Sequence, residues 1–194
     1  MDSHLIESKL KSQELFRGSF LHAFRDTVAL PDGTQASREY VIHPGAVMIV
    51  PLLEVSGQPL QLVMERQFRY PVQQVMLEFP AGKLGPNEST LECAQRELFE
   101  ETGYSAKQWA KAGVMHPVIS YSTEFIEIWF AKDLSLGERQ LDPGEFLEVI
   151  TQTPEALKQA CLKGEVTDGK TLTGMFWLQN YLSGQHALTW VNAA

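Results

Sequence analysis

The sequence has few of the features that mark secreted, membrane-spanning or disulfide-stabilised proteins. Its 194 residues include only 2 cysteines. Cys93 and Cys161 both lie in helix-like segments, which favours reduced structural residues over a disulfide or a metal site. There is no run of 18 or more apolar residues, so no membrane span is expected. Residues 1–16 lack the apolar core of a signal peptide, and we therefore expect a cytoplasmic protein.

Positive charge is also scarce. The 16 Lys and Arg residues are outnumbered by 24 Asp and Glu residues, and the net charge is −8. Such a chain lacks the diffuse positive field that holds nucleic acid backbones, so a broad nucleic-acid binder is not expected. A small anionic substrate held by a few arginines and a bound cation is compatible with this charge. The hydrophobic content of 44% is that of an ordinary globular protein.

The first part of the chain reads as a small separate unit. Residues 4–16 are expected to form a short helix, and a turn is expected at Pro31-Asp32-Gly33. Short strands are expected at 20–24, 27–30 and 37–42. Because so small an antiparallel unit cannot bury its own apolar face, it should pack on the main domain or on a second copy of the chain. We place the boundary at residue 43, with a strand unit over 1–43 and a main domain over 44–194.

The main domain alternates between strand-like and helix-like segments. Strands are expected at 46–53, 60–67, 74–79, 111–118, 124–131 and 145–150, with a polar loop over 132–144. Ser89 and Glu92 form a capping-box pattern, and Gly103 suits the end of the helix that follows. Further helices are expected after Thr153 and from about Asp168 to Leu182. This interleaving predicts an α/β fold with a mixed sheet.

The helix that begins near Ser89 carries an unusual set of acidic residues. Glu97 and Glu101 are four residues apart, which places them about 40° apart on one helix face, and Glu100 flanks that face. Three carboxylates so close repel one another. This pattern fits either a solvated acidic face or a site for a divalent cation. Their hard oxygen ligands suit Mg²⁺ or Mn²⁺.

The acidic helix belongs to a longer pattern. The fixed positions of the Nudix hydrolase signature are occupied by Gly82, Glu88, Arg96, Glu97, Leu98, Glu100, Glu101 and Gly103. The segment resembles that signature at every fixed position; Tyr104 stands where an aliphatic residue is usual, at a position that packs rather than reacts. The resemblance implies a Nudix α/β/α sandwich with a mixed sheet, and hydrolysis of a nucleoside diphosphate linked to another group.

The resemblance also implies roles for residues of the signature. Glu97, Glu100 and Glu101 are expected to bind Mg²⁺ or Mn²⁺, together with the backbone carbonyl of Ala81. Arg96 is expected to pair with a helix glutamate and orient it. Glu88 is expected to support the site rather than to bind the metal.

Segments outside the signature resemble the ADP-ribose pyrophosphatase subfamily. They are residues 30–33, 38–41, 43–47, 66–71, 78–82 and 164–171. Residues 118–124 depart from the Ser-Pro-Gly-like turn that the subfamily often has, and this loop helps to shape the sugar end of the site. The resemblance implies a homodimer with exchanged N-terminal strands, which agrees with the need of the strand unit for a packing partner.

Substrate contacts and the catalytic base are less sharply indicated. Arg38 and Arg69 are candidates for phosphate or ribose contact, and Glu78 for a substrate-contacting carboxylate. Each could also be an ordinary surface or strand-end residue. In similar enzymes the base is a glutamate on a loop after the signature, which makes Glu145 the first candidate and Glu148 the second. Alternatively, Glu100 or Glu101 orients the attacking water through the metal.

We therefore expect a Mg²⁺-dependent, homodimeric enzyme that hydrolyses ADP-ribose to AMP and ribose 5-phosphate. One alternative is a hydrolase of another nucleotide sugar, such as GDP-mannose. A second alternative is a Nudix-fold module that binds ADP-ribose without cleaving it. Such modules usually lose carboxylates of the signature, whereas all of them are present here.

Overall fold

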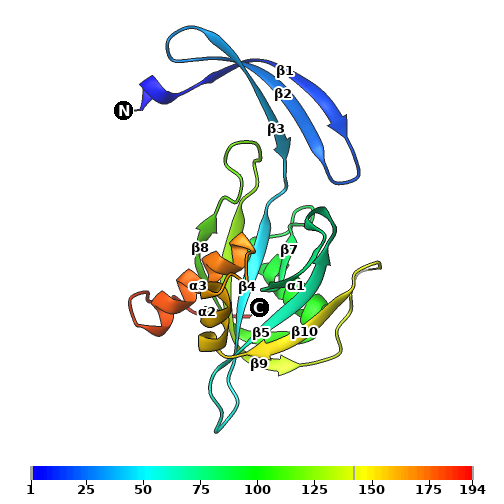
Figure 1. Ribbon diagram of the computed structural model, residues 1–194, viewed down its shortest axis with the longest axis vertical. Coiled ribbons are helices and arrows are strands. Elements are labelled where there is room, and N and C mark those ends of the chain that lie inside the picture. The colour runs from blue at the N-terminus through cyan, green and yellow to red at the C-terminus, as the bar shows by residue number, and fades with distance from the viewer. Residues whose placement is uncertain (1, 142, 194) are drawn as a thin grey trace. The chain divides into compact units, whose positions relative to one another are not determined.

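The computed structural model describes residues 2–141 and 143–193, which form two compact units (Figure 1). Unit 1 consists of the chain up to Gly45 together with His116–Glu124. Unit 2 consists of Ala46–Met115 and the chain from Phe125 onward. Within the described residues, no helix combines the length and apolar character that crossing a membrane requires.

Unit 1 is a three-stranded antiparallel sheet in the order β1-β2-β3. Its strands are β1 (Ser8–Arg17), β2 (His22–Ala29) and β3 (Gln35–Ile42), preceded by a 3-10 turn at Ser3–Leu5. The helix expected over 4–16 is therefore wrong. Its Lys, Leu, Gln and Glu residues are good helix formers, but pairing with β2 from Ser8↔Ala29 to Arg17↔His22 overrides that local preference.

Unit 2 is built on one mixed sheet in the order β10-β5-β4-β9-β8-β11, in which β6 also pairs with β5 and β7 with β4. The strands are β4 (Ala46–Leu53), β5 (Gln61–Arg69), β6 (Gln74–Glu78), β7 (Ala81–Lys83), β8 (Tyr104–Met115), β9 (Ile126–Leu136), β10 (Leu147–Gln152) and β11 (Val191–Asn192). β4 and β9 run parallel, whereas the other pairs are antiparallel. The expected mixed sheet is confirmed.

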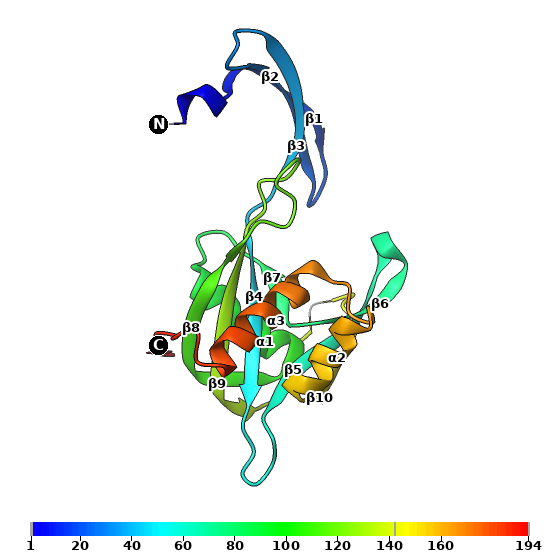
Figure 2. The same ribbon diagram turned by 60° about the vertical axis from the view of Figure 1, so that its left-hand side comes forward.

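Helices cover both faces of this sheet (Figure 2). They are α1 (Thr90–Thr102), α2 (Pro154–Leu162) and α3 (Gly169–Leu182), and a 3-10 turn lies at Tyr70–Val72. Along β4, Met48 and Val50 pack in the cluster that includes α2 and α3. Val47 and Ile49, which alternate with them, pack in the cluster that includes α1. The result is the expected α/β/α sandwich.

Helix ends agree with the local signals, but some strand ends do not. Ser89 and Glu92 form the capping box of α1, and Gly103 ends the helix with a left-handed φ of 77°. β8 begins directly after this residue, at Tyr104, rather than at 111. β9 continues to Leu136, so the loop expected over 132–144 begins later; residue 142 of that range lies outside the described residues.

Candidate active site

The acidic helix α1 packs against β7, and the contact depends on a missing side chain. A Cβ atom on Gly82 would lie 1.8 Å from the carboxylate carbon of Glu97. Since real Cβ atoms do not approach so closely, only glycine at position 82 leaves room for this carboxylate. Gly82 pairs with Val47 of the central strand β4, so the sheet holds the glycine in place. The glycine and the glutamate of the signature therefore meet in space.

Arg96 forms hydrogen bonds with three carboxylates of the signature. Its Nε and Nη2 donate to the two oxygens of Glu88 at 2.7 and 2.9 Å. Its Nη1 donates to Glu97 at 2.8 Å and to Glu100 at 3.0 Å. The hydrogen bonds that Glu88 accepts, first those from Arg96 and then one from the backbone N–H of Gly85, lower the pKa of Glu88 to about 2. Burial instead raises the pKa of Glu97 despite Arg96, and the charges of Glu100 and Glu145 add to the rise.

Glu101 lies deeper than the other signature glutamates. Its side chain is buried, and its Oε2 accepts a hydrogen bond from the backbone N–H of Ala81 at 3.1 Å. Burial, followed by the charges of Glu65, Glu97 and Glu145, raises the pKa of Glu101 well above its usual range. This residue therefore sits where negative charge accumulates and is poorly solvated.

A second ionic cluster lies where β5, β6 and the start of α3 meet. Arg69 donates from Nε and Nη2 to the two oxygens of Glu78, both at 2.8 Å, and Lys170 also binds Glu78. Lys170 in turn contacts Asp168, the residue that caps α3, at 3.0 Å. Burial alone would raise the pKa of Glu78, but Arg69 and Lys170 hold it below its usual value. The two candidate substrate residues, Arg69 and Glu78, thus bind each other.

The loop after β9 is attached to the end of α1. The N–H of Gly137 donates to the carbonyl of Gly103 at 2.8 Å, and that of Gln140 to the carbonyl of Glu100 at 3.2 Å. Further along this loop, Glu145 is half-buried, and its charge acts on Glu97 and Glu101.

The second candidate base has a different setting. Glu148 is exposed and pairs with Arg66 at 2.9 Å. The charge of Glu145 therefore acts on the acidic helix, whereas Glu148 forms an exposed ion pair with Arg66.

Arg38 lies on β3 in unit 1. Its guanidinium pairs with Glu7, with Nε 3.0 Å from Oε2. It belongs to a different unit from the acidic helix. The loop that departs from the subfamily pattern is in the same unit as Arg38, since Thr123 N–H donates to the carbonyl of Val41 at 3.0 Å.

The donor set can be tested against a divalent cation. Among the described residues, no three acidic, histidine or cysteine side chains converge as a ready metal cage. Mg²⁺ does not require such a cage, since it is usually held by one or two carboxylates, with water and substrate phosphates completing its shell. Among the residues that the structure describes, the buried carboxyl of Glu65 has no hydrogen-bond partner on either oxygen, and Glu101 has a strongly raised pKa. Hard oxygen donors and uncompensated negative charge suit Mg²⁺ or Mn²⁺.

Two residues of these clusters were not predicted to be functional from sequence. Glu65 lies on β5 and Lys170 at the start of α3. A signal for Glu65 was present, because a carboxylate at the end of the apolar run Leu62-Val63-Met64 is unusual in a buried strand. For Lys170 there was only the similarity of its segment to the subfamily.

Two family models match the chain, and together they span most of it. The model described as NUDIX domain matches residues 42–173. The model described as nucleoside diphosphate sugar hydrolase N-terminal domain matches residues 7–41.

Curated relatives and a solved structure also resemble the chain over nearly its full length. The ADP-ribose pyrophosphatase of Bacillus subtilis (strain 168) is 34% identical over 177 residues, which is 90% of this chain and 94% of the relative. The methanol dehydrogenase activator of Bacillus methanolicus is also 34% identical, over 89% of this chain and 92% of its own. A crystal structure of an ADP compounds hydrolase shares the fold, with a TM-score of 0.80 at 23% identity, and covers 92% of this chain and 95% of that one.

Proposed function

This chain belongs to the NUDIX family, and from that premise we propose that it hydrolyses the diphosphate of ADP-ribose to AMP and ribose 5-phosphate. The observation that carries the proposal is the close packing of Glu97 on Gly82, with Glu101 bound to the N–H of Ala81. The similarity to a relative named ADP-ribose pyrophosphatase supports the choice of substrate.

We propose that Glu97, Glu100 and Glu101, with the carbonyl of Ala81, hold Mg²⁺ or Mn²⁺. When bound, such an ion neutralises charge on the diphosphate and lowers the pKa of a bound water. Arg96 orients Glu97 and Glu100 through the hydrogen bonds it makes to them.

We propose that Glu145 is the general base. It would accept a proton from the water that attacks phosphorus. The water oxygen forms the new P–O bond, the bond from that phosphorus to the bridging oxygen breaks, and the bridging oxygen leaves with the other phosphate. The action of the Glu145 charge on Glu97 and Glu101 supports this choice over Glu148.

Arg69 and Arg38 are the proposed contacts for the substrate's phosphate or ribose groups, and the carboxylate of Glu78 is also proposed to contact the substrate. Arg69 already has its guanidinium oriented by two hydrogen bonds to Glu78. An oriented guanidinium loses less conformational freedom when it binds a phosphate.

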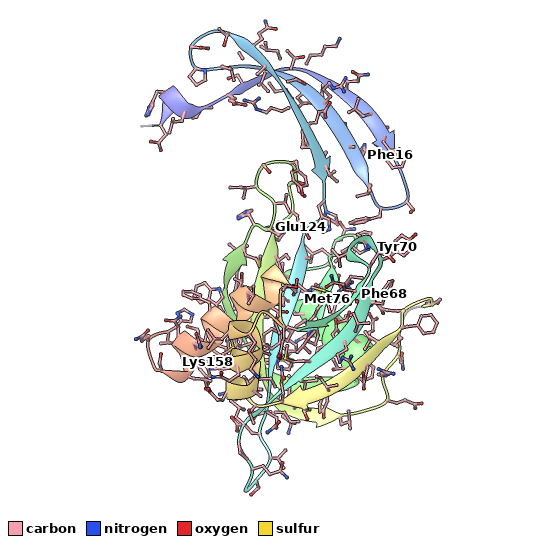
Figure 3. The ribbon with its side chains drawn as sticks, viewed as in Figure 1. Phe16, Phe68, Tyr70, Met76, Glu124 and Lys158 are labelled. Atoms are coloured by element: carbon pink, nitrogen blue, oxygen red, sulfur yellow. The ribbon has the colours of Figure 1, made fainter. Side chains whose placement is uncertain are left out.

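The proposal includes a homodimer that exchanges the strands of unit 1. Every residue of β1 is exposed, including Phe16, which is 56% exposed. In unit 2, Phe68 and Tyr70 of the β5–β6 region are 50% and 77% exposed (Figure 3). Apolar surface of this extent on both units is typical of a face that another chain covers. We also propose a cytoplasmic location, which suits the two free cysteines.

A nucleotide-sugar panel tests the activity. The full chain would be incubated with ADP-ribose, other ADP-sugars and GDP-mannose, with Mg²⁺, Mn²⁺ or EDTA, and the products separated by chromatography. We expect AMP from ADP-ribose with a divalent cation and none in EDTA; in ¹⁸O-labelled water, the label would identify the attacked phosphorus. Faster cleavage of GDP-mannose would move the assignment to that substrate. Tight ADP-ribose binding without cleavage under any metal would indicate a binding module.

The dimer is tested by light scattering coupled to size exclusion. We expect twice the chain mass for the wild type, and monomer with reduced activity for Phe16→Ser. Leu162→Ser changes an exposed apolar residue on α2, which is 72% exposed, and serves as the control. A fully active wild-type monomer would contradict the exchanged dimer.

A further inference from the structure

Glu65 is a fully buried ionisable residue whose carboxyl forms no ion pair within the described part of the chain. It lies on the central region of β5, its side chain is 0% exposed, and neither carboxylate oxygen has a hydrogen-bond partner there. Unpaired carboxyl groups are rarely buried, because their charged form loses its hydration and gains nothing in return. An apolar residue would fill this position at lower cost, as Val63 does two residues earlier on the same face.

The strand directs this carboxyl toward the acidic helix. Leu62 and Met64 pack in the cluster that includes α2 and α3. Alternation along the strand therefore turns Glu65 to the opposite face of the sheet, which α1 covers. Among the buried charges that act on Glu101, Glu65 is the strongest. The two carboxyls, one from the sheet and one from the last turn of α1, thus face the same small region.

Within the described residues, no basic side chain forms an ion pair with either carboxyl of this pair, although the charges of Lys170 and Arg69 act on Glu65. Arg69 and Lys170 are bound to Glu78, which is opposite Glu65 across β5 and β6. Arg96 is bound to Glu88, Glu97 and Glu100. Within the described residues, neither Glu65 nor Glu101 forms an ion pair with any of the three. The two carboxyls therefore lack a direct ion-pair partner among the described residues, which leaves room for a bound cation.

We propose that Glu65 is a further carboxylate of the cation site, supplied by the sheet, which together with Glu101 holds the divalent ion directly or through a bound water. The inference rests on the proposed function, since it assigns a new residue to that same site. Carboxylate oxygens are the hard donors that Mg²⁺ and Mn²⁺ prefer.

Metal binding without substrate tests this role. Mn²⁺ affinity of the full chain would be measured by electron paramagnetic resonance for the wild type, Glu65→Gln and Glu65→Leu. We expect both variants to bind Mn²⁺ roughly 10- to 100-fold more weakly, the range for residues that support metal ligands. In EDTA both should melt at or above the wild-type temperature, because a buried, uncompensated carboxyl is gone. Mn²⁺ should raise the melting temperature of the wild type more than that of either variant.

The control is Glu155→Gln, which removes one carboxylate from α2 in the layer on the other side of the sheet. It should bind Mn²⁺ as the wild type does. Mn²⁺ affinities of Glu65→Gln and Glu65→Leu within twofold of the wild type would overturn the inference. The proposed function would survive that result if ADP-ribose cleavage still required a divalent cation and Glu101. It would fail separately if the wild type cleaved no nucleotide sugar.

Discussion

Gly82 and Glu97 are separated by 14 intervening residues, yet the carboxylate of Glu97 occupies the space that a side chain at position 82 would need. The clash would be with the carboxylate itself, at 1.8 Å from its carbon and its Oε1. This contact couples the position of β7 to that of a proposed metal ligand on α1.

Gly82→Ala is therefore expected to displace Glu97 and break its hydrogen bond with Arg96. We expect ADP-ribose turnover to fall by roughly 100-fold or more, with only a small change in the free energy of unfolding, because the clashing atoms are the far end of the Glu97 side chain. Gly169→Ala is the matched control, since nothing lies within 4 Å of a Cβ there. Urea unfolding and a product assay would measure both variants; unchanged turnover in Gly82→Ala would rule out the close contact.

Glu101→Gln tests the buried end of the acidic cluster. The amide oxygen can still accept the hydrogen bond from Ala81, but the negative charge is lost. We expect turnover to fall by at least about 100-fold, because the lost charge would stabilise the transition state through the bound cation. The fold should persist, because the hydrogen bond to Ala81 is kept. Circular dichroism melting would confirm the fold. Near-normal activity would remove Glu101 from the site.

Glu145→Gln and Glu148→Gln form a discriminating pair. Loss of a general base typically lowers the rate by about 10²–10⁴-fold, and we expect this for Glu145→Gln. Glu148 is an exposed partner of Arg66, so its replacement should change kcat by less than about threefold. Steady-state kinetics would compare the two. The reverse order of effects would make Glu148 the base, and small effects in both would favour a signature glutamate.

Arg69→Met tests the bond between Arg69 and Glu78. Glu78 is 1% exposed and would keep only Lys170, so we expect a loss of about 1–3 kcal/mol in the free energy of unfolding. A rise in KM for ADP-ribose would show that Arg69 also contacts substrate. Arg66→Met on the same strand removes an exposed ion pair and should cost less than about 1 kcal/mol. Equal costs in urea unfolding would contradict the buried role of Glu78.

The pairing of Glu88 with Arg96 predicts a dependence of stability on pH. The pKa of Glu88 is about 2 in the folded protein, below its ordinary 4.5. Its contribution is therefore fully present above about pH 4.5 and is lost as the pH falls toward 2. We expect Glu88→Gln to be less stable by about 1–2 kcal/mol at pH 7, after allowance for solvent screening, with the difference shrinking by pH 3. Urea titrations at both pH values would measure it; a constant difference would exclude the charge effect.

Features that depend on neighbours along the chain were predicted well. The capping box at Ser89 and the left-handed Gly103 delimit α1, and Thr153 caps α2, as expected. Each of these signals acts within one helical turn, so the residues concerned carry the information themselves. β4 was equally readable, because a continuous apolar run suits a strand covered on both faces.

Features that depend on distant partners were not predicted. Residues 8–17 prefer a helix locally, but β2 offers them a ladder of hydrogen bonds. The polar cluster of Arg69, Glu78 and Lys170 combines two neighbouring strands with the start of α3, far along the chain. No pattern within a short window can show that such residues meet.

The sequence by itself determined the acidic helix, its ends, the spacing of its carboxylates from Gly82, and through these the family. These are matters of helical periodicity and capping, which are local. Only the tertiary structure decided which charges are compensated. Strand register and the packing of α1 on the sheet place Arg96 against three carboxylates, while Glu65 faces Glu101 with no basic partner among the described residues. The interaction between a carboxylate and a basic side chain depends on the distance between them, and only the folded chain sets that distance.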